Sequence, residues 1–273
     1  MRQWTVDAFT PRLFGGNQAC VVEPFSCWPS EALMQSIASE NNVGATAFIV
    51  ADPGGGPFGL RWFTPAVEVP LCGHATLAAA HVLFTETKTL SSIANFESRS
   101  GPLSVQQQGE GYELSLPLQR ADRTKTPEGL ATALGAEPLE VWAGAYLVVL
   151  LQTAEEVRTL HPDLKALREI SLSLGGQGNV GVAAMEPPGS LHQVIDRFFA
   201  PGYGIPEDPA TGSFHGILTP ILAPRFDTSS VRFFQAYPNR GAEFEGRVVG
   251  DRVLLGGNAV TFSESQLRAR LDG

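Results

Sequence analysis

Two stretches that lie half the chain apart carry the same residues at the same spacing. One starts at Arg61 and reads RWFTPAVEVPLCGHA, and the other starts at Arg197, 136 residues later, and reads RFFAPGYGIPEDPATGSF. An arginine, a phenylalanine and two prolines coincide, the second proline pair being Pro70 and Pro206. Chance is the alternative, since RFF occurs once more, but that copy lacks the proline spacing. We interpret the pattern as an internal duplication, which restricts the fold to two similar halves.

Both copies of the repeat end at a glycine that opens an apolar helix. Three residues inserted in the second copy bring Gly73-His74 over Gly212-Ser213, and the stretches ATLAAAHVLF and FHGILTPILA follow. Such apolar bodies indicate helices that a sheet covers on most sides. A helix N-terminus carries unpaired N–H groups, and glycine lets a ligand approach the backbone. We expect the two helix starts to hold a small anionic substrate between them; the alternative is a turn glycine with a capping histidine.

Composition narrows the class of partner. The 273 residues include 28 acidic and 19 basic side chains, a net charge of −9, and offer no basic face for a nucleic acid. No apolar run is long enough to span a bilayer, and the opening MRQWTVDAFT reads as a strand rather than as a signal peptide. The three cysteines lack metal-binding spacing. We expect a cytoplasmic protein with free thiols that binds neither nucleic acid nor membrane.

Strand-like runs alternate with a few helical ones along the chain. ATAFIVA, LRWFTP and YELSLPL are rich in β-branched or aromatic residues, as strands are. Helices are expected after a cap at Ser30, from Thr126 onward, and within EEVRTLHPDLKALREI. The polar segment 118–127 is the best candidate for a linker. The predicted halves are 1–115 together with a C-terminal strand at 258–273, and 116–257.

Five blocks, in order along the chain, carry a family likeness. They read VDAFTPRLFGGNQACVV, LRWFTPAVEVPLCGHATLAAAHVLF, FESRSGPLSV, RFFAPGYGIPEDPATGSFHGIL and EGRVVGDRVLLGGNAVTF. Together they resemble the PhzF-like (phenazine biosynthesis-like) family over essentially the whole chain. The resemblance implies the α/β (α+β) fold of diaminopimelate epimerase and proline racemase, with two pseudo-symmetric halves, each a curled mixed β-sheet or barrel around a central helix. It also implies an active site between the halves, a homodimer, and a cofactor-independent isomerisation, best known on dihydro-hydroxyanthranilate.

One position departs from the family pattern. The family's catalytic glutamate lies in a stretch like NLSET, and this chain reads NVGAT there, so Ala45 takes the place of the carboxylate. Losing a general acid or base typically costs a factor of about 10²–10⁴ in rate. The other family positions match. By resemblance, substrate binding or proton transfer falls to Cys72, Gly73, His74, Asp208, Gly212 and Ser213.

Two residues could replace the missing carboxylate, and each has a plainer explanation. Asp208 could act as the base, or it could only cap the helix that Pro209 begins. Cys72 could be a thiolate at a helix start, or an inert buried thiol. Glu207 is expected on the solvated surface.

Two classes of function stay open at this point. One is a cofactor-free isomerase or epimerase that acts on a small cyclic amino or hydroxy carboxylic acid by proton abstraction and return. The other is a catalytically disabled relative that binds such an acid or a protein partner.

The remaining motifs do not predict a cofactor-binding or metal-binding site. GQGNVG, at 176–181, fits a dinucleotide-binding pattern, but prolines follow too soon for the helix that such a site needs. His81 lies within an apolar helix, where a hydrogen-bonded core histidine is expected rather than a metal ligand. We therefore expect neither a cofactor nor a metal.

Overall fold

The computed structural model describes residues 1–88 and 92–268, so residues 269–273 of the predicted C-terminal strand lie outside the described residues. The chain divides into two compact units. Unit 1 comprises Met1–Leu116 and Gly256–Gly273, and unit 2 comprises Pro117–Leu255. That these units are the functional halves expected from the repeat stays a prediction.

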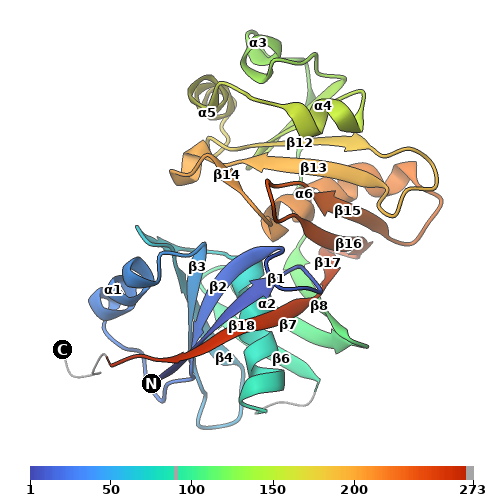
Figure 1. The fold of residues 1–273 in the computed structure, drawn as a ribbon. Coiled ribbons are helices and arrows are strands. Elements are labelled where there is room, and N and C mark those ends of the chain that lie inside the picture. Colours follow the sequence, from blue (N-terminus) through green and yellow to red (C-terminus); the bar gives the residue numbers. More distant parts are fainter. Residues whose placement is uncertain (89–91, 269–273) are drawn as a thin grey trace. The chain divides into compact units, whose positions relative to one another are not determined.

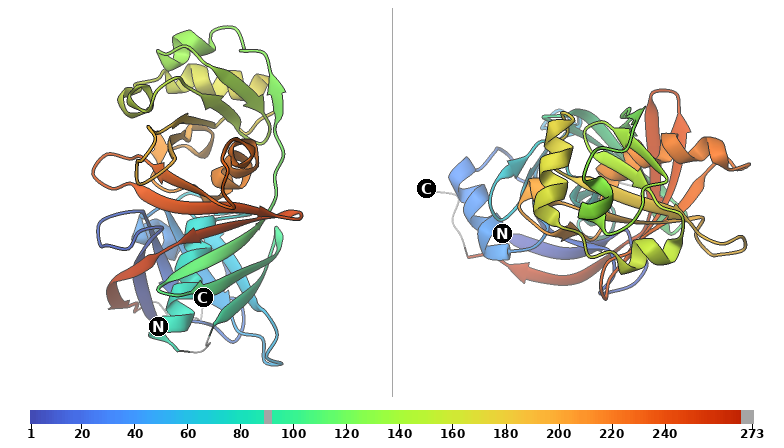
Figure 2. Two further views of the ribbon diagram at one scale, coloured as in Figure 1. Left: turned by 90° about the vertical axis from the view of Figure 1, so that its right-hand side faces the viewer. Right: turned by 90° about the horizontal axis from the view of Figure 1, so that it is seen from above.

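Unit 1 is a mixed sheet around one buried helix. Its strands follow the order β18, β1, β2, β3, β4, β6, β7, β8, and β5 pairs with the end of β4. The strands are β1 (Arg2–Ala8), β2 (Asn17–Val22), β3 (Ala45–Val50), β4 (Phe58–Phe63), β5 (Glu68–Val69), β6 (Ile93–Ser98), β7 (Gly101–Gln108), β8 (Gly111–Pro117) and β18 (Ala259–Gln266). The helices are α1 (Glu31–Asn41), α2 (Gly73–His81) and the π-helical turn η1 (Val82–Glu86). Helix α2 contacts β1, β2, β3, β7 and β18, and Figures 1 and 2 show it enclosed among the strands of this unit.

Unit 2 is built in the same way around α6. Its strands follow the order β9, β10, β11, β12, β13, β15, β16, and β14 pairs with the end of β13. The strands are β9 (Asp122–Thr124), β10 (Glu140–Ala143), β11 (Leu147–Leu150), β12 (Val180–Met185), β13 (Val194–Phe199), β14 (Glu207–Asp208), β15 (Val231–Gln235), β16 (Ala242–Val249) and β17 (Arg252–Gly257). The helices are α3 (Leu130–Leu134), α4 (Ala154–Thr159), α5 (Leu164–Ser173), α6 (Gly212–Leu222) and the 3-10 turns η2 (Pro201–Tyr203) and η3 (Ala223–Arg225). Figure 1 shows α6 beside β15 and β16.

The two units share one topology. Strands β1 to β7 correspond in order to β10 to β16, with the same succession of antiparallel and parallel pairs. In each unit a two-residue strand, β5 or β14, leads into the buried helix. The predicted fold class, two similar halves that each place a mixed sheet around a central helix, is confirmed.

Composition explains why α2 and α6 become the central helices. All nine residues of α2 are buried, and alanine and leucine, which have high helix propensity, make up most of it. Helix α6 is likewise apolar, and Pro220 in its last turn lacks the N–H that would bond the carbonyl of Gly216, so the helix ends soon afterwards at Leu222. A helix that is apolar all round has to be covered on every side, and the curled sheet provides that cover.

The strand register places the three-residue insertion of the second repeat copy earlier in the chain than the sequence comparison did. Strands β5 and β14 pair with equivalent ends of β4 and β13, which makes Glu68 and Glu207 equivalent. The three extra residues therefore lie before Glu207, in the region of η2, and not after Pro206. The predicted match of Pro70 with Pro206 is wrong for this reason.

Of the local predictions, the helix cap is confirmed, whereas the linker and the start of the next helix are wrong. The cap at Ser30 is confirmed, because its Oγ accepts the N–H of Leu33 at 3.3 Å. The segment 118–127, expected as a linker, contains β9, which pairs with β10. The helix expected from Thr126 begins only at Leu130, after Gly129 takes a left-handed φ of 79°.

Candidate active site

A repeated ion pair fixes the segment that leads into each central helix. Arg61 donates to both carboxylate oxygens of Glu68 at 2.7 and 2.6 Å, and Arg197 donates to both oxygens of Glu207 at 2.7 and 2.8 Å. Each guanidinium also lies over the phenylalanine two residues further on, at 5.3 and 4.8 Å. Bidentate pairs of this kind are strong and directional. The expectation that Glu207 is solvated surface is wrong, since only 11% of its side chain is exposed.

The central helices start without a side-chain cap. Cys72 precedes α2 and Thr211 precedes α6, and neither side chain accepts a hydrogen bond from the first turn. By contrast, Ser30, Thr153 and Asp163 cap α1, α4 and α5 with their side-chain oxygens. Capping normally satisfies the free N–H groups of a first turn. In α2 and α6 the first-turn N–H groups are therefore not bonded to an N-cap side chain, which is also the case in the short helix α3.

His74 is a neutral, hydrogen-bonded group in the first turn of α2. It is 6% exposed, and its Nδ1 lies 3.4 Å from Asn17 Nδ2 and 3.5 Å from Cys72 Sγ. Burial lowers the pKa of His74 to about 4, against a smaller opposite effect from a hydrogen bond to the backbone of Gln18. At neutral pH the imidazole therefore carries no charge and serves as a hydrogen-bonding partner of Cys72, which is half-buried.

Ala45 opens β3 close to this histidine. It is 1% exposed and pairs with Ala19 of β2. A Cβ added at the preceding residue, Gly44, would lie 3.3 Å from His74 Nε2 and 2.7 Å from Asn17 Oδ1. The position predicted for the family glutamate therefore belongs to the same part of unit 1 as His74 and Cys72.

Asp208 is held beside the start of α6 by a different contact from the one expected. Its Oδ2 accepts the hydroxyl proton of Thr211 at 2.6 Å. Buried Gln235 fixes both residues, because its Nε2 donates to the carbonyl of Asp208 at 2.7 Å and its Oε1 accepts the N–H of Thr211 at 2.7 Å. The alternative that Asp208 caps a helix starting at Pro209 is wrong, since the helix starts at Gly212 and Thr211 is its N-cap.

Ser213 begins a chain of hydroxyl groups. Its Oγ lies 2.9 Å from the hydroxyl of Tyr146, which lies 2.7 Å from the hydroxyl of Tyr203. Tyr203 in turn donates to Gln177 Oε1 at 3.2 Å. Gln177 belongs to the GQGNVG stretch, which leads into strand β12.

The predicted site residues form two groups, one in each unit. Unit 1 contains Ala45, Cys72, Gly73 and His74, and unit 2 contains Asp208, Gly212 and Ser213. Their joint action on one substrate stays a prediction. Sequence reasoning missed the residues that hold these groups in place, namely Asn17, Tyr146, Gln177, Tyr203 and Gln235.

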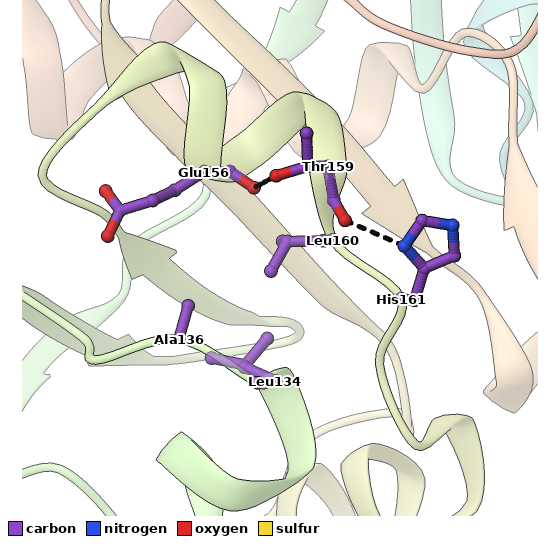
Figure 3. Close-up of a pocket in the computed structure, with 7 residues that line it drawn as sticks. Leu134, Ala136, Glu156, Thr159, Leu160 and His161 are labelled. Carbon is purple, nitrogen blue, oxygen red and sulfur yellow. Dashed lines mark hydrogen bonds between the residues drawn. The ribbon is translucent and has the colours of Figure 1, made fainter.

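A separate surface pocket of about 260 Å³ lies in unit 2 (Figure 3). Figure 3 shows Leu134 and Leu160 facing the hollow, with Thr159 and His161 at its side. His161 Nδ1 lies 2.8 Å from the carbonyl of Thr159. None of the predicted site residues lines this pocket. Within 1–88 and 92–268, no group of three or more His, Cys, Asp or Glu side chains could hold a metal ion.

His81 has the environment expected of a core histidine. Its Nδ1 lies 2.7 Å from the hydroxyl of Tyr112, and its Nε2 lies 2.9 Å from Thr261 Oγ1. Burial lowers the pKa of His81 to about 4, opposed in part by the charge of Glu86.

Comparisons with known proteins agree with this construction. The sequence model of the phenazine biosynthesis-like protein family (PhzC-PhzF) matches residues 6–265. The chain is 41% identical over 264 residues to an uncharacterized isomerase of Pseudomonas aeruginosa, covering 96% of this chain and 97% of that protein. It is similar to the crystal structure of a phenazine biosynthesis protein of the PhzF family from Enterococcus faecalis, with a TM-score of 0.89, 36% identity, and coverage of 97% and 99%.

A more distant likeness concerns the fold alone. The structure of a probable proline racemase from Agrobacterium radiobacter is 11% identical, with a TM-score of 0.62 and coverage of 98% and 93%. Among the described residues, none of the helices has the length and apolar character needed to cross a membrane.

Proposed function

The chain belongs to the phenazine biosynthesis-like protein family, and on that premise we propose that it is a cofactor-independent isomerase or epimerase of a small cyclic amino or hydroxy carboxylic acid. The observation that carries the proposal is the repeated construction of α2 and α6, two buried helices that start at a glycine without a side-chain cap. In this proposal the N–H groups at Gly73 and Gly212 bind the substrate carboxylate. The same donors stabilise the negative charge that develops when a proton leaves the neighbouring carbon.

Asp208 is the base that we propose. The hydroxyl of Thr211 and the amide of Gln235 hold it in one orientation at the start of α6. A carboxylate so placed takes a proton from one carbon of the substrate, and a proton returns to another carbon or to the opposite face, with no net gain or loss. Cys72 is the second candidate because it contacts the neutral His74. His74 then orients the thiol and does not itself carry the proton.

A catalytically disabled relative that binds the same class of acid is the second candidate function. The replacement of the family glutamate by Ala45 favours it, because a methyl group transfers no proton. In that case the uncapped helix starts keep their use as a carboxylate site, and turnover is absent.

Proton exchange separates the two functions. The protein would be incubated in D₂O with dihydro-hydroxyanthranilate or L-proline, and the loss of the α-proton signal would be followed by NMR. An isomerase exchanges the proton, and Asp208→Asn should slow the exchange by a factor of about 10²–10⁴. Asp163→Asn is the matched control, because Asp163 caps α5 at the surface of the same unit and should leave exchange unchanged. Exchange that Asp208→Asn leaves intact would exclude Asp208 as the base.

Ligand-induced thermal stabilisation without exchange in the unaltered protein would instead support the disabled relative. We also propose a homodimer on the strength of the family membership. Sedimentation equilibrium would test it, and a monomer at micromolar concentration would contradict it.

A further inference from the structure

The hydroxyl chain at the start of α6 ends at a hydrogen-bond acceptor, the side-chain oxygen of Gln177. The chain runs from Ser213 through Tyr146 and Tyr203 to Gln177, with distances of 2.9, 2.7 and 3.2 Å. Its last contact is with the carbonyl oxygen Oε1 of Gln177, which has no proton to give. That end therefore determines the direction of every other bond in the chain.

Counting protons fixes these directions. A hydroxyl group carries one proton, so Tyr203, which donates to Gln177, has to accept from Tyr146. Tyr146 has then used its own proton and has to accept from Ser213. The proton of Ser213 consequently points into the protein, toward Tyr146.

Aromatic packing holds the chain in this geometry. The ring of Tyr146 is 4% exposed and makes edge contacts with Phe198 at 4.9 Å and with Tyr203 at 6.4 Å. Phe198 packs in turn on Phe214 of α6 at 5.3 Å. Tyr203, which is 48% exposed, and Gln177 form the exposed end of the chain, and Gln177 lies outside the aromatic contacts, so this residue can be changed without disturbing the core.

We propose that Tyr146, Tyr203 and Gln177 are positioning residues that keep the proton of Ser213 turned inward, so that Ser213 meets a ligand only as a hydrogen-bond acceptor. This rests on the proposed function, in which Ser213 contacts the substrate. An acceptor at this place favours a ligand group that donates, such as a protonated amine, and disfavours an ether or hydroxyl oxygen that needs a donor. The Asp208 carboxylate, held by Thr211 at the same helix start, favours a cation as well.

Two substitutions at the exposed end test the direction. Gln177→Glu has only acceptor atoms and should keep the chain as it is, whereas Gln177→Lys has only donors and should reverse it, which turns the proton of Ser213 outward. The probes are L-proline and tetrahydrofuran-2-carboxylate. Both have a five-membered ring with a carboxylate, but L-proline has an NH₂⁺ group in the ring where the other compound has an ether oxygen. Isothermal titration calorimetry should give a preference for L-proline of about tenfold or more in the unaltered protein and in Gln177→Glu. In Gln177→Lys this preference should fall by about tenfold.

The same two substitutions made together with Ser213→Ala distinguish an effect that passes through the hydroxyl chain from a long-range effect of the charge at residue 177. In that background, the variants with Glu and with Lys at residue 177 should have the same ratio of affinities for L-proline and tetrahydrofuran-2-carboxylate. The reason is that the Ser213 hydroxyl, through which the chain contacts the ligand, has been removed. A ratio that shifts as much with Ser213→Ala as without it would overturn the proposal. So would a preference for L-proline that Gln177→Lys leaves intact.

Neutron diffraction of the deuterated, unliganded protein tests the direction without a ligand. We expect the deuteron of the Ser213 hydroxyl on the line to Tyr146, and a deuteron of Tyr146 that points at Ser213 would overturn the proposal. If that deuteron lies as expected and neither probe binds, the proposed substrate class fails while the direction of the chain stands.

Discussion

At residue 45 a methyl group lies where a proton-transferring side chain is expected from the family. The residue opens β3, is buried, and follows Gly44, which has no room for a side chain beside His74. We expect Ala45→Glu to create or raise α-proton exchange by about 10²–10⁴, since a positioned carboxylate supplies about 3–5 kcal/mol of barrier lowering. NMR in D₂O with dihydro-hydroxyanthranilate would measure it.

The matched control for this change is Ala45→Gln. It has the size and polarity of the glutamate variant but cannot take up a proton, so it should leave exchange at the level of the unaltered protein. Suppose instead that the unaltered protein already exchanges the α-proton rapidly and Ala45→Glu slows it. Then another base operates, and a disabled family enzyme is no longer a tenable description.

Two buried histidines make stability depend on pH. The pKa values of His74 and His81 are about 4 in the folded protein, against about 6.5 in the unfolded chain. The unfolded chain therefore takes up protons first as the pH falls, so stability is full above pH 6.5 and declines between about pH 6.5 and 4. Each histidine contributes on the order of 3 kcal/mol to that loss.

Replacing one of them should flatten the decline. His81→Gln keeps a donor and an acceptor for Tyr112 and Thr261 but does not titrate. Urea unfolding at pH 7.0 and 4.5 should show a smaller difference for this variant than for the unaltered protein. An equal difference would mean that His81 ionises in the folded state as freely as in the unfolded chain.

At the scale of single elements, we expect the first turn of α6 to tolerate a larger side chain less well than the middle of the same helix. Gly212→Leu puts a side chain where a ligand is proposed to approach the backbone, and we expect it to abolish carboxylate-induced thermal stabilisation. Gly216→Ala is the control in the same helix, because a Cβ there meets only the carbonyl of Pro117 at 4.0 Å. It should retain ligand stabilisation and raise the free energy of unfolding by up to about 1 kcal/mol. Undiminished stabilisation in Gly212→Leu would place the carboxylate elsewhere.

Local signals account for the part of the structure that could be predicted from the sequence. A glycine followed by an apolar run identifies both central helices, and the repeated spacing identifies the shared construction. Contacts between distant segments could not be predicted in this way. Ser213 meets Tyr146 from 67 residues away, and His74 meets Asn17 from 57 residues away, and no periodic pattern links such pairs.

The alternative that Asp208 caps a helix beginning at Pro209 is wrong for a related reason. Asp followed by Pro is an ordinary helix start, but here Asp208 pairs with Phe198 as part of β14, and the helix begins only at Gly212. Strand pairing across the sheet overrode the local signal. The insertion before Glu207 was misplaced because proline spacing alone does not fix a register, whereas the ladder of β13 and β14 does.

For the whole molecule, the first and last described strands belong to one unit. Strand β18 pairs with β1 from Arg2↔Gln266 to Ala8↔Ala259, so unit 1 needs residues from both ends of the described chain. Val260→Pro places a proline in this ladder opposite Asp7 and should weaken it, because proline fits poorly inside a paired strand. Hydrogen exchange measured by mass spectrometry should show faster exchange in β1 and β2, with protection in β11 to β13 retained. Equal loss of protection in both units would mean that they unfold as one.

The position of β18 also sets the order in which a newly made chain can fold. The edge of β1 that β18 will cover emerges from the ribosome first, and its partner strand emerges only after Pro117–Leu255 has been made. At about 5–20 residues per second, synthesis of the chain from Ala8 to Ala259 takes roughly 12–50 s. During it β1 offers an open backbone edge to any other strand nearby, which is the usual route to misassembly. The length of unit 2 therefore determines how long each nascent chain stays exposed to that risk.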